Sequence, residues 1–155
     1  MKKIALLLGT VLVFSMLAGC QLSRTSMDLD TFTAEAEAAG YTVFDTTNSY
    51  PDDTVGICRI ATKGSDYIEY QIEFVLVATV EQAKAIYQEI YSEYESRKGV
   101  SSSYSSVSVG NYSYYRLTTN GKYYVVSRTA NTFLYVEALE EYKSEISDFL
   151  SSIGY

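Results

Sequence analysis

The chain of 155 residues contains no histidine, no tryptophan, a single proline and only two cysteines. The absence of histidine excludes Ser-His-Asp triads and histidine-ligated metal sites. The nine glycines are scattered, and none falls in the GxGxxG or Walker spacing of a phosphate-binding loop. We therefore expect no metal, no cofactor and no common catalytic set in this protein.

The N-terminus combines positive charge with the most apolar run of the chain. Lys2 and Lys3 precede about 14 apolar or weakly polar residues, which is near the length of the h-region of a signal peptide. A membrane-spanning helix needs roughly 20 consecutive apolar residues, and polar residues from Gln21 onward end the run too early for one. The pattern predicts an export signal over residues 1–19.

The end of this run, Leu17-Ala18-Gly19-Cys20, matches the lipobox, and the N-terminus resembles that of bacterial lipoprotein precursors. The resemblance implies a thioether-linked diacylglycerol on Cys20 and cleavage between Gly19 and Cys20. Two acyl chains hold a protein stably at a membrane where one does not. The mature chain would then begin with a lipidated cysteine and a short polar tether over 20–27. An ordinary secretory signal and a buried core helix are the alternatives.

The resemblance also implies a location on the outer face of the cell membrane, or on an outer membrane if the cell is diderm. The 136 residues left after cleavage are enough for one domain, which we expect over 28–155. Lys2 and Lys3 leave with the signal, so ten basic residues stand against 19 acidic ones, a net charge of −9. Such a surface repels phosphate backbones and anionic headgroups. We expect no nucleic-acid partner and attachment to the membrane only through the lipid.

Cys58 is the one cysteine left once Cys20 is consumed as a thioether, so no intrachain disulfide is available. It lies in the apolar, strand-like run TVGICRIAT. A single thiol could act as a nucleophile, but no histidine exists to activate one. The sequence context favours a small buried side chain.

Hydrophobic periodicity predicts an α+β fold. Apolar stripes at helical spacing predict three helices, over 28–39, 79–98 and 141–153. Alternating apolar residues predict about six to seven strands, over 41–47, 55–62, 67–77, 105–109, 112–118, 122–128 and 133–139. The serine-rich stretch 101–106 is expected to be a flexible link. We expect a mainly antiparallel sheet with the three helices packed on one face, and two divergent helix-plus-sheet halves are one option.

The mature segment also resembles small lipoproteins of unknown function from Gram-positive gut bacteria. The resemblance rests on the AGYTV turn, the LTTNGKYYVVSR hairpin and the terminal IGY. It carries no known catalytic residues. It therefore implies a cellular location and no mechanism.

Carboxylate pairs are the remaining candidates for chemistry. Asp52 and Asp53 lie in a predicted turn, and Asp28 and Asp30 lie at a predicted helix start, where acidic residues cap the helix. Glu140-Glu141 precedes the last helix, a favourable position for negative charge. A calcium site or a paired-carboxylate catalytic site is the alternative interpretation of these acids.

Tyrosine is the most unusual feature, with 16 in the chain. Asn120-Gly121 is the strongest hairpin signal, because both turn positions need positive φ. A two-residue loop there pairs Leu117 with Tyr124 and Tyr115 with Val126, which would form a core face. The reverse face then carries the candidate binding residues Tyr112, Tyr114, Arg116 and Tyr123.

Tyrosine and arginine are enriched in binding hot spots, so this face is a candidate interaction surface. Cross-strand tyrosine pairs that only stabilise the sheet, or a helix that covers this face, are the alternatives. We expect a non-enzymatic, lipid-anchored extracytoplasmic binding or interaction module, with a protein or a cell-wall glycan as partner. The alternative is an envelope-glycan-acting enzyme or enzyme regulator that uses paired carboxylates.

Overall fold

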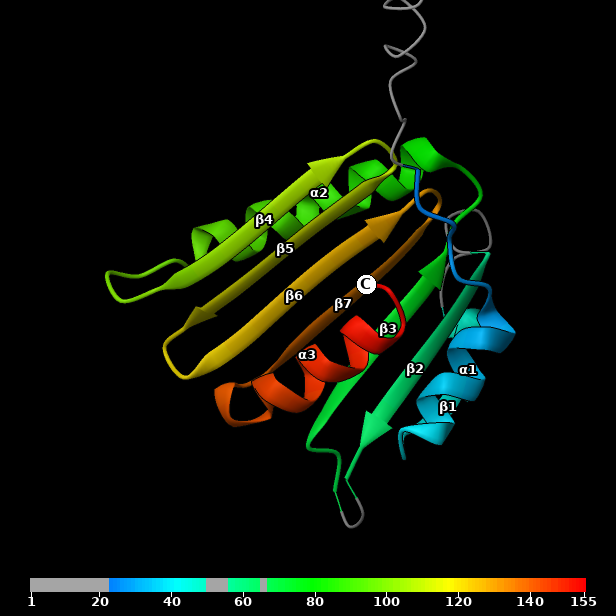
Figure 1. Cartoon of the computed structure of the whole chain (residues 1–155), viewed down its shortest axis with the longest axis horizontal. Helices are drawn as coiled ribbons and strands as arrows, with labels where there is room; N and C mark the ends of the chain where they lie inside the picture. The colour runs from blue at the N-terminus through cyan, green and yellow to red at the C-terminus, as the bar shows by residue number, and fades with distance from the viewer. Residues whose placement is uncertain (1–22, 50–55, 65–66) are drawn as a thin grey trace, which may run out of the picture.

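One antiparallel sheet organises the chain. The computed structural model describes residues 23–49, 56–64 and 67–155. In these residues the strands are ordered β1-β2-β3-β7-β6-β5-β4 across the sheet (Figure 1). The elements in chain order are α1 (Leu29–Ala38), β1 (Thr42–Asp45), η2 (Thr47–Ser49), β2 (Ile57–Lys63), β3 (Tyr70–Leu76), α2 (Val80–Ser96), β4 (Ser103–Val109), β5 (Tyr112–Thr119), β6 (Lys122–Thr129), β7 (Thr132–Leu139), η3 (Glu140–Tyr142) and α3 (Lys143–Ser152). The predicted α+β fold with a mainly antiparallel sheet is confirmed.

Local signals in the sequence fix the starts of α1 and α2. Asp28 caps α1 by accepting a hydrogen bond from the backbone N–H of Thr31 at 2.9 Å. Thr79 and Gln82 form the reciprocal capping box of α2. These bonds satisfy backbone donors that have no partner inside the first turn of a helix.

The turn at Asn120-Gly121 fixes the register of the central hairpin. Asn120 has φ 51° and Gly121 has φ 73°, the left-handed geometry that a tight hairpin requires. Leu117 pairs with Tyr124, and Tyr115 pairs with Val126 as predicted. The last hairpin turns tightly as well, with Thr129 paired to Thr132.

The helices cover both faces of the sheet, so the prediction that all three pack on one face is wrong. Figure 1 shows α1 and α3 in front of the sheet and α2 behind it. Phe32 of α1 and Ile146 of α3 share a core cluster with Tyr123 and Val125 of β6. On the other face, Tyr94 of α2 packs with a second set of strand residues, which includes Tyr115, Leu117, Tyr124 and Val126. The physical reason is that the central strands carry apolar side chains on both faces, and each face needs a cover.

The remaining expectations about the fold have mixed outcomes. Cys58 is fully buried in a cluster with Val75 and Phe133, as predicted. The prediction of a flexible link over 101–106 is wrong from Ser103 onward, because β4 begins at that residue. Among the described residues, no helix has both the length and the apolar character needed to cross a membrane.

Candidate anion-binding groove beside β4

The predicted binding residues Tyr112, Tyr114, Arg116 and Tyr123 do lie on one face of the sheet, but most of that face is covered. Arg116 of β5 pairs with Val125, and Thr118 pairs with Tyr123, so Arg116 and Tyr123 point to the same side of the sheet. Tyr123 is fully buried beneath α3, where its hydroxyl lies 3.0 Å from the Ser147 hydroxyl. Only Arg116 of the four candidate residues is exposed. An alternative noted for this face, coverage by a helix, applies to Tyr123.

The other two tyrosines of the candidate face are held in place by their neighbours. The rings of Tyr112 and Tyr114 stack with their centroids 6.5 Å apart. Burial raises the pKa of Tyr114, and the neighbouring Tyr123 raises it further. Tyr112 is buried, and the guanidinium carbon of Arg24 lies 3.6 Å from its ring centroid.

Arg24 belongs to the segment that we expected to be a polar tether, and it is docked on the domain. Its backbone N–H donates to the Asn111 side-chain oxygen at 2.8 Å, and the Asn111 amide donates back to the Arg24 carbonyl at 2.7 Å. Its guanidinium donates to the Gly154 carbonyl at 2.9 Å. The chain is therefore fixed to the domain from residue 24, at the turn between β4 and β5.

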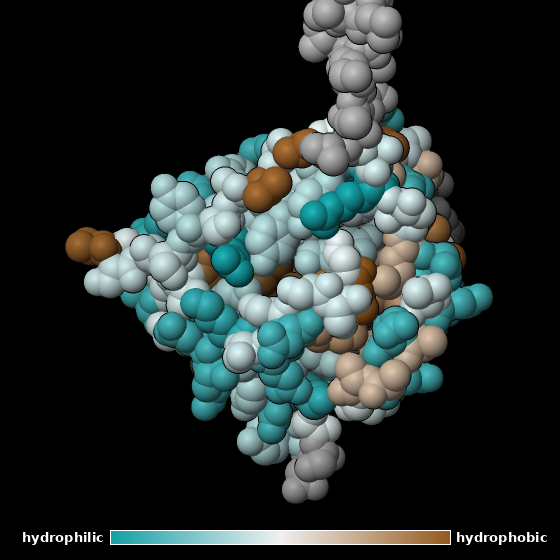
Figure 2. All heavy atoms as spheres, viewed as in Figure 1, coloured by the Kyte–Doolittle hydropathy of each residue, from teal (hydrophilic) through white to brown (hydrophobic). Residues whose placement is uncertain are grey.

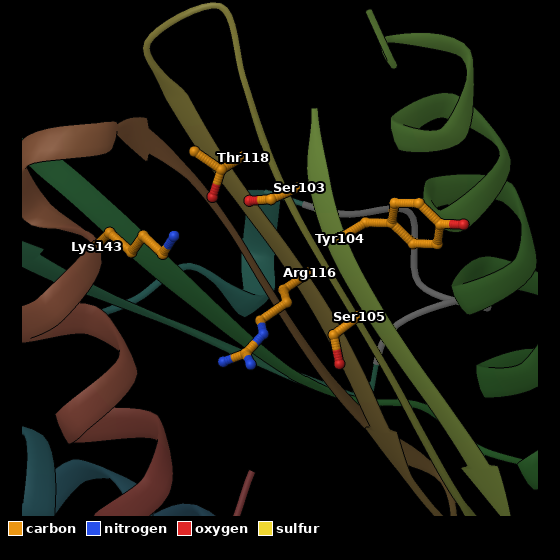
Figure 3. Close-up of a pocket in the computed structure, with 6 residues that line it drawn as sticks. All are labelled: Ser103, Tyr104, Ser105, Arg116, Thr118 and Lys143. Atoms are coloured by element: carbon orange, nitrogen blue, oxygen red, sulfur yellow. The ribbon is translucent and has the colours of Figure 1, made fainter. Parts of the chain in front are cut away.

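A groove lies between the N-terminal end of β4 and the start of α3. Its volume is about 200 Å³, and its lining consists of Ser103, Tyr104, Ser105, Arg116, Thr118 and Lys143 (Figure 3). Ser103 pairs with Thr118 and Ser105 pairs with Arg116, so these four side chains share one face of the sheet. In Figure 3 the Lys143 side chain extends from α3 toward this face, and the ring of Tyr104 points away toward α2. We call this feature the cationic groove.

The cationic groove contains two basic side chains that have no ion-pair partner among the described residues. Five described cations have a carboxylate oxygen within 4 Å, namely Arg59, Lys63, Arg97, Lys98 and Lys122. In the part of the chain that the structure describes, Arg116 and Lys143 have no such partner. The Nζ atom of Lys143 lies 5.8 Å from the ring centroid of Tyr123. Lys143 also lines the same groove as Thr118 and Arg116, so its charge lies beside theirs. Two positive charges therefore line one groove without compensating carboxylates.

This arrangement can bind an anionic group. The guanidinium of arginine offers a planar fork that matches a carboxylate or a phosphate, and serine and threonine hydroxyls can donate to the same oxygens. Figure 2 shows mainly hydrophilic and intermediate side chains over α3 and the outer strands, with hydrophobic atoms in small separate patches. The groove therefore belongs to a polar surface and suits a polar ligand.

Sequence reasoning identified only part of the cationic groove. Arg116 was a candidate residue and Thr118 lies on its predicted face, but Lys143, Ser103 and Ser105 were missed. The alternation in SYSSVSV is typical of a strand and could have placed both serines on one face. No local signal could have placed Lys143, because only the packing of α3 on the sheet brings it to β5.

The described acidic residues that were candidates for a calcium or catalytic site cap a helix or are exposed to solvent. Asp28 caps α1, and the hydrogen bonds it accepts from the Thr31 backbone and side chain lower the pKa of its carboxyl group. Glu140 and Glu141 are exposed in η3. Asp52 and Asp53 lie outside the described residues. No group of three or more Cys, Asp or Glu side chains positioned to hold a metal ion occurs within residues 23–49, 56–64 and 67–155.

Comparisons with known proteins add no function. No protein-family model matches this chain, and no curated protein matches it significantly. Among solved structures, a GTP-binding regulator from Thermotoga maritima is similar to it with a TM-score of 0.42 and 22% sequence identity. The match covers 77% of this chain and 84% of that one. A likeness this distant carries no inference about what the chain does.

Proposed function

We propose that this protein is a lipid-anchored binding module on the outer face of the cell membrane, and that its cationic groove binds an anionic group of a partner. The observation that carries the proposal is the pairing of Arg116 with Lys143 in one groove without a carboxylate among the described residues. The chain has a net charge of −7. A site of opposite sign on such a chain favours a carboxylate or a phosphate from outside.

Binding rather than catalysis fits the chemistry of the groove. Its hydroxyls belong to Ser103, Ser105 and Thr118, and the chain has no histidine that could activate one of them. Two cations and three hydroxyls can orient an anion and neutralise it. The ligand group can come from an acidic side chain of a protein or from an acidic cell-wall glycan.

The docked residue Arg24 and the groove lie at different ends of β4. Arg24 is docked at the β4–β5 turn, and the four residues from Cys20 to Arg24 span at most about 14 Å. A lipid on Cys20 would therefore hold this turn close to the membrane surface. The groove lies beside Ser103 at the other end of the strand, roughly 20 Å away at the rise of an extended strand. This geometry leaves the groove open to partners outside the membrane.

The lipid anchor is tested by metabolic labelling. Cells that express the full chain are supplied with an alkyne fatty acid, and the protein is expected to carry the label in the membrane fraction. Cys20→Ser is expected to remove the label and to release or mislocalise the protein, because the thioether needs the sulfur. Cys58→Ser serves as the control and should leave the label unchanged. A labelled Cys20→Ser protein would contradict the anchor.

The groove is tested by photo-crosslinking in cells with the anchor retained. A photoreactive residue at Ser103, which is exposed and lines the groove, is expected to give an adduct. Arg116→Gln combined with Lys143→Gln should reduce that adduct at least about tenfold, since charged hydrogen bonds contribute about 1.5–3 kcal/mol each. Exposed Ser92 of α2 is the matched control position.

The adduct also identifies the partner class. A discrete protein band would indicate an acidic protein partner, and a heterogeneous glycan-sized smear would indicate the cell wall. Equal adducts from Ser103 and Ser92, or an adduct from Ser103 that survives the double substitution, would show that the groove is not the binding site.

A further inference from the structure

The two edges of the sheet differ in how they are protected. An edge strand exposes unpaired backbone groups, and proteins block such edges with short strands, charges, prolines or bulges. The edge strand β1 has four residues, and its Asp45 forms an ion pair with Arg59 at 2.7 Å. The opposite edge strand, β4, has seven residues, SYSSVSV, without a charge or a proline. Its register against β5 is unbroken from Ser103 to Val109.

The backbone of β4 is positioned to accept another strand. β4 and β5 are joined by a two-residue turn in which Gly110 has φ 58°. In such a hairpin the residues that flank the turn bond to each other, and the bonding alternates from there. Tyr104, Ser106 and Ser108 therefore direct their backbone N–H and C=O groups outward. Among the described residues these groups face no other strand, because β4 ends the sheet.

Side-chain grooves flank β4 on both faces. The cationic groove lies on the α3 side. On the α2 side, a second cavity of about 270 Å³ is lined by Tyr87, Gln88, Tyr91, Ser106, Val107 and Ser108. Successive side chains of a strand point to opposite faces, so a strand added to β4 would direct alternate residues toward the two cavities. Peptide-binding domains that add a strand obtain specificity in this way.

We propose that β4 accepts an extended segment of a partner protein as an eighth strand, with an acidic side chain in the cationic groove. The inference rests on the proposed function, because the acidic side chain is the anion that the groove binds. Neighbouring residues of the segment, which face α2, are uncharged and meet the rings of Tyr87 and Tyr91. The partner is thus an acidic strand-forming segment in which a glutamate or aspartate is flanked by apolar residues.

The spacing of the strands permits this contact. Ser105 separates Arg116 from an incoming residue, which places the two Cα atoms roughly 10 Å apart across two strand spacings. An arginine and a glutamate can cover this distance together, and the small Ser105 side chain leaves their path open. Lys143 approaches from α3 on the same side.

Charge favours a foreign strand over a second copy of this chain. Pairing of two β4 strands would bring together two strands that contain no carboxylate. It would also bring two Arg116 side chains to the same new sheet without neutralising either. An acidic segment supplies the missing charge.

The test uses the full chain in detergent micelles and a labelled nine-residue peptide. In this peptide threonine and valine alternate, and the central threonine is replaced by glutamate. Fluorescence anisotropy is expected to show binding of this peptide that is at least tenfold tighter than that of the glutamine version. Methylation of the peptide nitrogens that face β4 should abolish binding, because it removes the donors of the strand ladder without altering the protein.

Two variants of the protein separate this inference from the proposed function. Ser106→Pro blocks the free edge at a nitrogen that faces outward and should abolish binding of both peptides, with an unchanged thermal midpoint as the folding control. Arg116→Gln should remove the preference for glutamate and retain weak binding.

Full binding by the N-methylated peptide or by Ser106→Pro would overturn strand addition. A glutamate preference that survives Arg116→Gln would instead overturn the groove as the anion site. A third outcome is a dimer, measured after correction for bound detergent, that binds no peptide and that Ser106→Pro dissociates. This outcome would assign the edge to a second copy of the chain and would overturn the inference.

Discussion

Raising the pH above 10 is expected to unfold this domain, because many of its tyrosines are neutral in the fold and resist ionisation. Burial raises the pKa of eight of them, Tyr41, Tyr70, Tyr87, Tyr94, Tyr114, Tyr115, Tyr142 and Tyr155. For Tyr87 the pKa rises to about 12. The pKa of Tyr70 is raised further by the hydroxyl of Tyr41, whose oxygen lies 2.9 Å from the Tyr70 hydroxyl oxygen.

The sign of the effect follows from where the protons are held. The unfolded chain releases its phenolic protons near pH 10, whereas the folded chain retains them to higher pH. The stabilisation is therefore fully present below pH 10 and is lost as the pH rises toward the folded-state pKa values. Each buried tyrosine lowers the free energy of unfolding by about 1.4 kcal/mol per pH unit in this range.

The sum is comparable to the stability of a whole domain. Five of these tyrosines, Tyr70, Tyr87, Tyr94, Tyr114 and Tyr115, have the largest increases in pKa. Together they would lower the free energy of unfolding by about 5–7 kcal/mol at one pH unit above 10, and domains are stable by about 5–15 kcal/mol. We expect cooperative unfolding between about pH 10.5 and 11.5.

Tyrosinate absorbance and far-UV circular dichroism measure this transition together, since the chain has 16 tyrosines and no tryptophan. The two signals should change in one step. Tyr94→Phe removes a buried phenol that donates to the Val136 carbonyl at 3.2 Å. It is expected to raise the alkaline midpoint while costing about 1 kcal/mol at pH 8. Tyr104→Phe alters an exposed ring and is the control. Gradual ionisation of the tyrosines without loss of the dichroism would contradict the prediction.

Phe32→Ala is expected to lower the free energy of unfolding by about 3–5 kcal/mol, the usual cost of a large cavity in a well-packed core. Phe32 is 0% exposed, and its ring stacks on Phe74 with the centroids 4.6 Å apart. It also meets Phe149 edge-on at 6.4 Å. The ring thus joins α1, β3 and α3, and its loss leaves all three with an unfilled space.

Urea unfolding at pH 7.5, followed by circular dichroism, measures this difference. Phe44→Ala is the matched control, because Phe44 lies on β1 and is 50% exposed. Its removal should change the free energy of unfolding by less than about 1 kcal/mol. Similar losses for the two variants would show that α1 is not packed on the sheet through Phe32.

The sequence predicted which residues share a face of β5 and β6, but it did not predict what covers that face. The alternation of β5 placed Arg116 and Tyr123 on one face from sequence alone, because side-chain direction in a strand depends only on position. The burial of Tyr123 required α3, and the groove required Lys143 from the same helix. A sequence pattern shows that a helix has an apolar stripe, but it does not show which surface that stripe covers.

What the sequence by itself determined is local. The Asn120-Gly121 turn set the register of β5 and β6, because few residues adopt positive φ at both positions. Thr79 and Gln82 set the start of α2 through bonds within one turn. The lack of histidine limited the available chemistry.

What only the tertiary structure decided is the arrangement of layers. Apolar side chains on both faces of β6 require two covers, and the chain places α2 on one face and α1 with α3 on the other. The same packing leaves β4 as an open edge and brings Lys143 beside Arg116. These outcomes depend on contacts between residues far apart in the sequence, whose free energies are small individually and are realised only when the whole core forms.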